Sequence, residues 1–274
     1  MIFVISIRSC KMFCLILASA LIAIAYGHSG RTHPLQQELF DNRIINGKDA
    51  NIEDHPYQLS FEINGKLNCG AVLVRPDVAI TAAHCTEGRS PTQITIRAGT
   101  SIRESGGQVA KVVEICEHPK YNPSNYWDYD FSVLKLEKSF ELGITVNTIQ
   151  LVSQEEEVET GTLGTVSGWG LTSSGGLPLR LQSVELPKVD DQKCADVYKP
   201  WNISLRMICY GFDEGGKGFC NGDSGGPIVV NGRVSGLVSW APGCGQSIYP
   251  TVYCRLSNPE IVAHLNHCLE KFNL

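Results

Sequence analysis

Hydrophobic and polar residues alternate or cluster in short runs along most of the chain from Ile44 onward. Such runs cover 57–63, 69–74, 93–99, 111–115, 131–137, 183–189, 227–232, 233–240 and 251–256. Glycine, proline, asparagine and aspartate separate them, and short apolar runs bounded by turn residues are typical of antiparallel strands. The pattern therefore predicts an all-β domain, either a barrel or a sandwich.

A helical pattern appears only near the end of the chain, at 260–271. Ile261, Leu265 and the pair Cys268–Leu269 recur at the spacing that places them on one face of a helix. His264 and His267 lie three positions apart in the same segment. This spacing is compatible with metal ligands, but we expect exposed helix histidines.

The first residues have the pattern of a secretory signal. Arg8 and Lys11 precede the apolar run 12–26, and small residues follow at its end. A membrane anchor is the alternative, but this run of 15 residues is shorter than the roughly 20 that span a bilayer. We therefore predict a signal peptide over 1–27. The next segment, 28–43, has neither apolar periodicity nor cysteine, so we do not expect it to pack as a domain.

Composition narrows the possible functions. The net charge of the 274 residues is −5 and no basic stripe occurs, which argues against a nucleic-acid partner. Eleven cysteines are present without a C-x-x-C pair, and nine of them follow Arg43. Widely spaced cysteines of this kind indicate disulfides formed in an oxidising compartment rather than a zinc site. We expect a secreted protein without a cofactor.

Three short motifs carry the candidate chemistry: TAAHC at 81–85, DFSVLKL at 130–136 and GDSGGP at 222–227. They place a histidine, an aspartate and a serine at His84, Asp130 and Ser224. A serine hydroxyl is a weak nucleophile that needs a histidine as base, and the histidine needs a carboxylate to hold its tautomer. The backbone N–H groups of Gly222 and Ser224 are candidates to bind an oxyanion.

The order and spacing of these motifs resemble the trypsin/chymotrypsin family of serine endopeptidases. IINGKDA at 44–50, SGWG at 167–170 and VSW at 238–240 add to the resemblance. It implies two perpendicular six-stranded antiparallel β-barrels with a C-terminal helix, together forming a peptidase domain over 44–274. It also implies that Ser224 is the nucleophile, His84 the general base and acid, and Asp130 the orienting carboxylate. Asp128 is a nearby alternative to Asp130.

The resemblance implies activation by proteolysis. Arg43 directly precedes Ile44, so 28–43 is expected to be an activation propeptide that a trypsin-like protease removes. The new amine of Ile44 would then pair with Asp223 and order the backbone of Gly222.

The resemblance also locates a substrate pocket at Gly218, Phe219, Ser239, Trp240, Ala241 and Thr251. Gly218 stands where trypsins carry the aspartate that selects Lys or Arg, so a neutral, apolar preference is expected. Ala241 and Thr251 narrow the pocket and favour small or medium aliphatic side chains. The sequence leaves the orientation of the Phe219 side chain open. If this side chain points out of the pocket, a preference for aromatic substrate side chains is the alternative.

Family resemblance further implies disulfides between Cys69 and Cys85, Cys194 and Cys209, and Cys220 and Cys244. For the remaining three cysteines we propose a Cys116–Cys268 bridge with Cys254 left over. The alternative is that all three are buried thiols. Asn202-Ile-Ser is the one N-x-S/T sequon with a permitted middle residue after Arg43.

We therefore expect a secreted, monomeric serine endopeptidase made as a zymogen. Its expected partners are polypeptide substrates, a trypsin-like activating protease and protein protease inhibitors, with no nucleic acid and no membrane. No metal site is expected, because 98–114 lacks the paired acids of calcium-binding family members. The alternative function is that of a catalytically inactive homologue acting as a binding protein.

Overall fold

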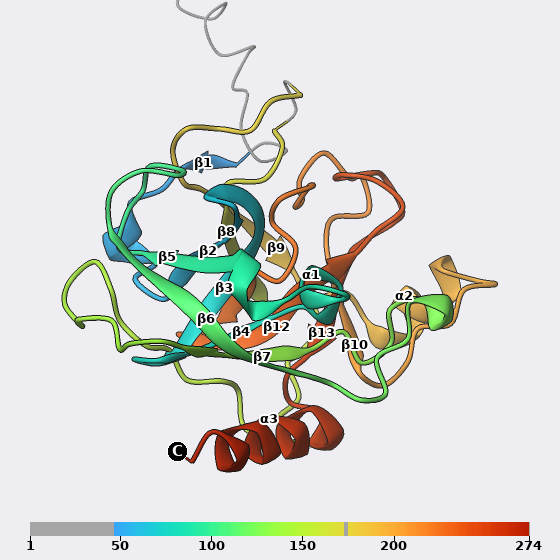
Figure 1. Ribbon diagram of the computed structural model, residues 1–274. Coiled ribbons are helices and arrows are strands. Elements are labelled where there is room, and N and C mark those ends of the chain that lie inside the picture. Colours follow the sequence, from blue (N-terminus) through green and yellow to red (C-terminus); the bar gives the residue numbers. More distant parts are fainter. Residues whose placement is uncertain (1–46, 173–174, 274) are drawn as a thin grey trace, which may run out of the picture. The chain divides into compact units, whose positions relative to one another are not determined.

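The computed structural model describes residues 47–172 and 175–273, and most of the regular elements in these ranges are strands (Figure 1). The predicted signal peptide 1–27, the predicted propeptide 28–43 and Ile44 lie outside the described residues. The prediction of an all-β domain with one longer helix at its end is confirmed.

Six strands close into a barrel in the first half of the described chain. Their order is β2 (Gln58–Ile63), β3 (Lys66–Arg75), β4 (Val78–Thr81), β7 (Ser132–Leu136), β6 (Gln108–Glu117) and β5 (Ile94–Ala98), which pairs with β2 again. Side chains point alternately inward and outward along a strand. In β5, accordingly, Ile94, Ile96 and Ala98 are buried while Thr95 and Arg97 between them are partly exposed.

Two hairpins of the fold follow directly from Asn-Gly pairs. Asn64 and Gly65 join β2 to β3 with φ of 52° and 74°, and Asn231 and Gly232 have φ of 49° and 75°. The second pair connects β11 (Pro227–Val230) to β12 (Arg233–Trp240). Two-residue turns with positive φ at both positions match the twist of antiparallel strands, and Asn-Gly tolerates them best. Local sequence therefore determines the register of both hairpins.

A second sheet has the order β1 (Lys48–Asp49), β9 (Gln182–Pro187), β8 (Leu163–Gly168), β11, β12, β13 (Thr251–Arg255) and β10 (Met207–Tyr210). The sheet closes on itself between β9 and β10. Directly after β9, Lys188 forms a bridge to Tyr210 of β10, and the Val189 N–H donates to the Cys209 carbonyl at 2.8 Å. Six strands thus enclose a second barrel, and the two-residue β1 pairs outside it along β9.

The helix α3 (Pro259–Lys271) crosses beneath the strands (Figure 1). Asn258 caps it by accepting from the Glu260 N–H, and Pro259 occupies its first turn, a favourable start for a helix. Ile261 and Cys268 are buried as expected, but His264 is buried too, with 7% exposure. The expectation that His264 is exposed is therefore wrong, because its face of α3 packs on β6. His267 is exposed.

Four disulfides join the elements. They are Cys69–Cys85, Cys116–Cys268, Cys194–Cys209 and Cys220–Cys244. The first, third and fourth are the pairings that the family resemblance implies, and the second attaches α3 to β6. Cys254 is a free, buried thiol.

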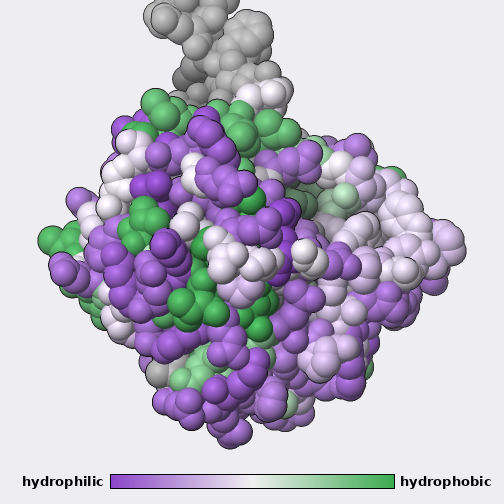
Figure 2. Space-filling view, in the orientation of Figure 1, coloured by the Kyte–Doolittle hydropathy of each residue, from purple (hydrophilic) through white to green (hydrophobic). Residues whose placement is uncertain are grey.

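The surface in Figure 2 is mostly hydrophilic, with hydrophobic residues in small separate patches. This is the pattern of a domain whose large apolar side chains fill internal cores. Over the described ranges, the structure contains no helix that is long and apolar enough to cross a membrane.

Candidate active site

His84 and Asp130 meet between the start of α1 (Ala83–Thr86) and the start of β7. His84 Nδ1 lies 2.8 Å from one Asp130 carboxylate oxygen, and the His84 backbone N–H donates to the other at 2.9 Å. The Asp130 side chain is 1% exposed, whereas that of His84 is 21% exposed. The carboxylate is therefore enclosed while the imidazole remains accessible from solvent.

A third donor completes the surroundings of Asp130. The Ser239 hydroxyl donates to Asp130 Oδ2 at 2.5 Å. A buried carboxylate is stable only when hydrogen-bond donors replace the lost water, and here the donors come from α1 and β12. Burial disfavours the charged form of His84, but the charge and hydrogen bond of Asp130, helped by Glu87, outweigh it and raise the pKa of His84.

The alternative aspartate, Asp128, has different partners. Arg206 donates to both of its carboxylate oxygens, from Nη2 at 2.6 Å and from Nε at 3.0 Å, and the Ser204 hydroxyl donates at 2.6 Å. Burial raises the pKa of Asp128, but these hydrogen bonds and the Arg206 charge outweigh it and lower the pKa. Asp128 is thus part of an ion pair, and Asp130 is the aspartate that contacts His84.

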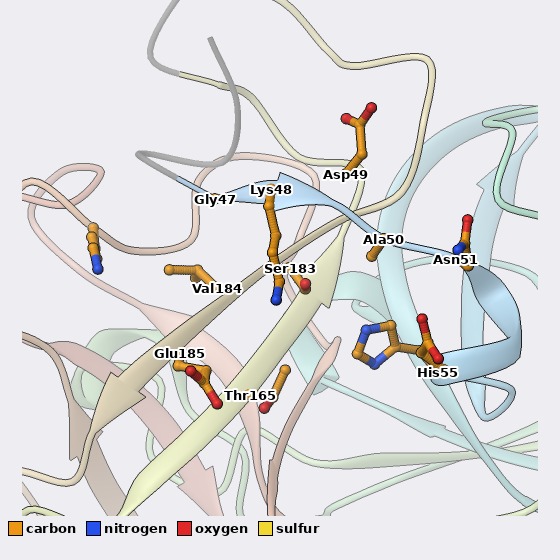
Figure 3. Close-up of a pocket in the computed structure, with 12 residues that line it drawn as sticks. Gly47, Lys48, Asp49, Ala50, Asn51, His55, Thr165, Ser183, Val184 and Glu185 are labelled. Carbon is orange, nitrogen blue, oxygen red and sulfur yellow. The ribbon is translucent and has the colours of Figure 1, made fainter. Parts of the chain in front are cut away.

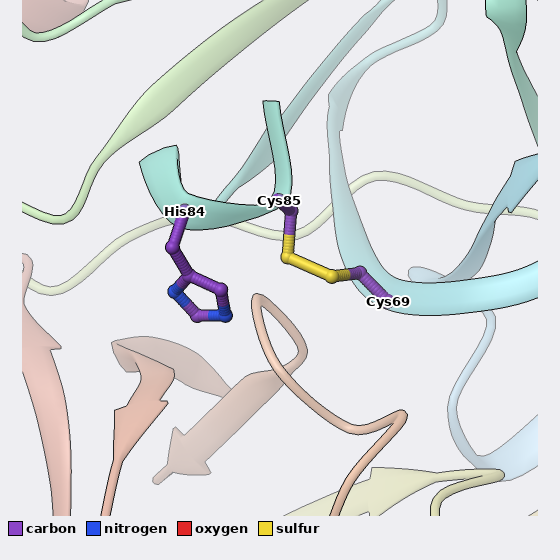
Figure 4. A group of neighbouring side chains, drawn as sticks. All are labelled: Cys69, His84 and Cys85. Atoms are coloured by element: carbon purple, nitrogen blue, oxygen red, sulfur yellow. A yellow bond between two sulfur atoms is a disulfide. The ribbon is translucent and has the colours of Figure 1, made fainter. Parts of the chain in front are cut away.

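The turn that carries Ser224 packs directly against this region. The Gly70 N–H donates to the Ser224 carbonyl at 2.8 Å, and the Cys85 sulfur lies 3.7 Å from the same oxygen. One ring nitrogen of His84 lies within 4.8 Å of the Cys85 sulfur, so the structure brings Ser224 and His84 into one neighbourhood. Figure 4 shows the His84 imidazole beside the Cys69–Cys85 disulfide.

Glycine is required next to Ser224 for steric reasons. Gly225 has φ of 75°, and a Cβ there would lie 2.1 Å from Thr81 Oγ1. Gly222 has φ of 103°, a region that residues with side chains rarely adopt. The glycines of the GDSGGP motif therefore permit the tight turn that carries Ser224.

Asp223 lies behind this turn and is fully buried. Its carboxylate accepts from the Gly170 N–H at 2.7 Å and from the Cys220 N–H at 3.1 Å. Burial is the main cause that raises the pKa of Asp223 to about 6, against the two backbone hydrogen bonds. Among the described residues no lysine, arginine or histidine pairs with it, and Ile44 is outside the described range.

The expected substrate pocket has a glycine and a buried phenylalanine side by side. Gly218 packs against Gly245, so that a Cβ at 218 would lie 3.2 Å from the Gly245 Cα. Phe219 is 7% exposed and belongs to a core cluster with Tyr253, against which Ala241 packs. Thr251 and Trp240 are buried as well.

Comparison with known proteins gives the family. The trypsin family profile matches residues 44–261. The vitellin-degrading protease of Bombyx mori is 40% identical over 79% of this chain and 83% of its own length. Trypsin 5G1 of Aedes aegypti is 36% identical over 89% and 94%, and cationic trypsin-3 of Rattus norvegicus is 37% identical over 87% and 94%. The chain belongs to the trypsin family.

As a member of the trypsin family the protein is a serine endopeptidase, and its substrates are polypeptides. This agrees with the predicted family, fold and enzyme class. Two groups of His and Cys donors occur among the described residues: Cys69, His84 and Cys85, and Cys116, His264 and Cys268. In both groups the sulfurs are joined in a disulfide. Because metals bind the thiolate, neither group is a metal site in this oxidised form.

A cavity of about 530 Å³ lies away from His84 and Asp130. It is lined by β1, β8, β9 and the segment carrying His55, with Lys48 and Glu185 among its charged side chains (Figure 3). None of the three catalytic candidates lines it.

One feature near the site was not apparent from the sequence. Six aromatic residues pack together in a cluster that we call the aromatic wall: Tyr126, Trp127, Tyr198, Trp201, Trp240 and Tyr249. The ring centroids of Trp127 and Trp201 lie 6.1 Å and 6.2 Å from that of Trp240. These residues come from four separate segments of the chain, including the end of β12 and the end of α2, so no local motif indicates that they meet.

Proposed function

We propose that the protein is secreted as a zymogen, is activated by cleavage after Arg43, and hydrolyses peptide bonds after neutral apolar residues. The observation that carries this proposal is the contact of His84 with the enclosed Asp130, next to the turn of Ser224. An inactive homologue acting as a binding protein is the second candidate. Such a protein would not need His84, Asp130 and Ser224 to lie close together.

In the proposed reaction the Ser224 hydroxyl attacks the carbonyl carbon of the scissile bond while His84 Nε2 takes its proton. The carbonyl oxygen becomes an oxyanion that the N–H groups of Gly222 and Ser224 stabilise. The imidazolium then gives the proton to the leaving amine as the C–N bond breaks. A water molecule, activated by the same imidazole, hydrolyses the acyl-enzyme.

Asp130 supports both proton transfers. Accepting from Nδ1 leaves Nε2 free to act as the base, and the negative charge stabilises the imidazolium. The raised pKa of His84 agrees with this role. The Ser239 and backbone donors hold the carboxylate in place.

The surroundings of Asp223 support the proposed activation. Its carboxylate is buried with two backbone donors, and no cation pairs with it in the described residues. A terminal amine has an ordinary pKa of roughly 8, so the amine of Ile44 would be cationic near neutral pH and would compensate the lost hydration. Arg43→Gln should therefore yield a secreted protein that trypsin does not activate. Full activity of this variant would contradict the proposal.

The pocket residues support a neutral preference. Gly218 offers no carboxylate, so a substrate lysine or arginine would be buried without a partner, at a cost of several kcal/mol. Phe219, itself one of the expected pocket residues, is buried in a cluster with Tyr253, and Ala241 packs against that cluster. A reduced pocket favours small or medium aliphatic side chains, and aromatic side chains are the second choice. Several relatives are named trypsins, but those names are not evidence for this pocket.

Secretion is supported by four disulfides, which form in oxidising compartments, and by the predicted signal over 1–27. We further propose a monomer that protein protease inhibitors can bind, since these inhibitors occupy the same cleft as a substrate.

The test combines an active-site label with a cleavage profile. After activation, a fluorophosphonate should label the wild type but not Ser224→Ala, and failure to label would favour the inactive homologue. A peptide library should show cleavage after neutral apolar residues. Dominant cleavage after Lys or Arg would overturn the specificity, and Phe219→Ser should increase cleavage after Phe and Tyr relative to Val and Ala.

A further inference from the structure

The loop between α2 (Asp191–Val197) and β10 exposes a single asparagine next to the aromatic wall. Asn202 is exposed, and it follows Trp201, whose ring packs 6.2 Å from that of Trp240. The Asn202 carboxamide makes no hydrogen bond to any described residue. Its side chain therefore points to solvent without a structural role in the loop.

The same residue begins the tripeptide Asn202-Ile203-Ser204. Asparagine followed by a non-proline residue and then serine or threonine is the acceptor for N-linked glycosylation, and acceptors lie on surface loops of secreted proteins. We propose that Asn202 carries an N-linked glycan, and that this glycan limits access of folded proteins to the substrate cleft. The proposal rests on the secretion included in the proposed function.

A second asparagine, in the loop that carries Tyr126, provides a contrast. Asn122-Pro123-Ser124 has proline at the middle position, which excludes it as an acceptor. Its carboxamide oxygen also accepts from the Ser124 N–H at 2.9 Å, in a turn that precedes Tyr126. The two loops therefore present one permitted and one forbidden acceptor, and the Tyr126 and Trp201 rings lie 6.5 Å apart.

Ser204 is engaged in the folded protein, since its hydroxyl donates to Asp128 at 2.6 Å. This contact does not oppose glycosylation, because the sugar is transferred to the extended chain before the fold closes. In the folded protein the Ser204 hydroxyl is bonded to Asp128, which also pairs with Arg206. The Asn202 side chain remains exposed.

The position of the glycan determines its effect. Trp201 contacts Trp240, and Trp240 follows Ser239, which donates to Asp130. A branched glycan on the neighbouring residue would stand at the outer end of the aromatic wall. A short peptide can pass beneath it, whereas a folded protein approaching the cleft would meet its bulk.

The test uses full-length protein secreted by a eukaryotic cell line, with PNGase F treatment of the medium. Wild type, Asn122→Gln and Ser204→Thr, which keeps the sequon, should each lose the mass of one glycan. Asn202→Gln should lose none. After activation, Asn202→Gln should cleave a short chromogenic peptide at the wild-type rate but a folded protein substrate at least about twice as fast.

Wild type that reaches the medium without a glycan at Asn202 would overturn this proposal and leave the proposed secretion intact. Protein that stays in the cell without a glycan would overturn both. An unchanged ratio of protein to peptide cleavage in Asn202→Gln would overturn the effect on access.

Discussion

Removing the Cys116–Cys268 disulfide should cost more stability than any other single change to a cysteine pair in this protein. The bond joins residues 152 positions apart, so it closes a loop that contains both Asp130 and Ser224. In the loop-entropy treatment, a cross-link over such a length destabilises the unfolded chain by about 5 kcal/mol at 25 °C. The two shorter disulfides inside the loop reduce this by only ~0.3 kcal/mol, because the dependence on length is logarithmic.

The assay is urea unfolding of the Cys116→Ala/Cys268→Ala double variant, with Cys254→Ala as the control. Cys254 is also buried but forms no bond, so its loss removes packing alone, about 1 kcal/mol. The double variant should lose at least about 3 kcal/mol more than the control, within the range found when native disulfides are removed. It should still be active at 25 °C, since Ile261 and Phe272 continue to pack α3 against the core. A double variant as stable as the control would refute the reasoning.

Three further changes test the site and its supports. Gly170→Ala would place a Cβ 2.3 Å from Asp223 Oδ2, so the activated enzyme should lose roughly 100-fold in kcat/KM, the loss expected for a disturbed oxyanion hole. Ser239→Ala removes one donor from Asp130; kcat should fall about 10-fold, from a hydrogen bond of ~1.4 kcal/mol, with KM nearly constant. Burial is the main cause that lowers the pKa of His118 to about 4, and the nearby His264 lowers it further. Because the folded state holds this histidine neutral, stability should fall as the pH drops from about 6.5 to 4, by at most about 3 kcal/mol. Melting temperatures across this range should fall less for His118→Phe.

Much of the fold could be predicted because its signals are local. Alternating runs such as 93–99 and 131–137 became β5 and β7, and the periodic segment at the end became α3. Asn-Gly pairs determine two hairpins through the backbone angles that those two residues permit. The residues of the GDSGGP motif likewise predict their own turn, because Gly222 and Gly225 permit the φ of 103° and 75° that the turn requires.

The sequence alone did not decide between groups that lie near each other along the chain but face different neighbours. Asp128 and Asp130 are two residues apart, yet one pairs with Arg206 from the second barrel and the other with His84 from the first. The orientation of Phe219 was equally open, and its burial depends on β strands that are distant in sequence.

By itself, then, the sequence determined nine of the strands, the two Asn-Gly turns, the terminal helix and the three motifs with their chemistry, since these depend on residues within a few positions. It did not indicate β1, β4, β8 or β10. The tertiary structure decided that His264 is buried, that the proposed Cys116–Cys268 bridge forms rather than two buried thiols, and that five other aromatic residues gather with Trp240. The physical reason is that these contacts form only when barrel closure brings distant segments together, and no periodicity within a segment encodes which partner its side chains will meet.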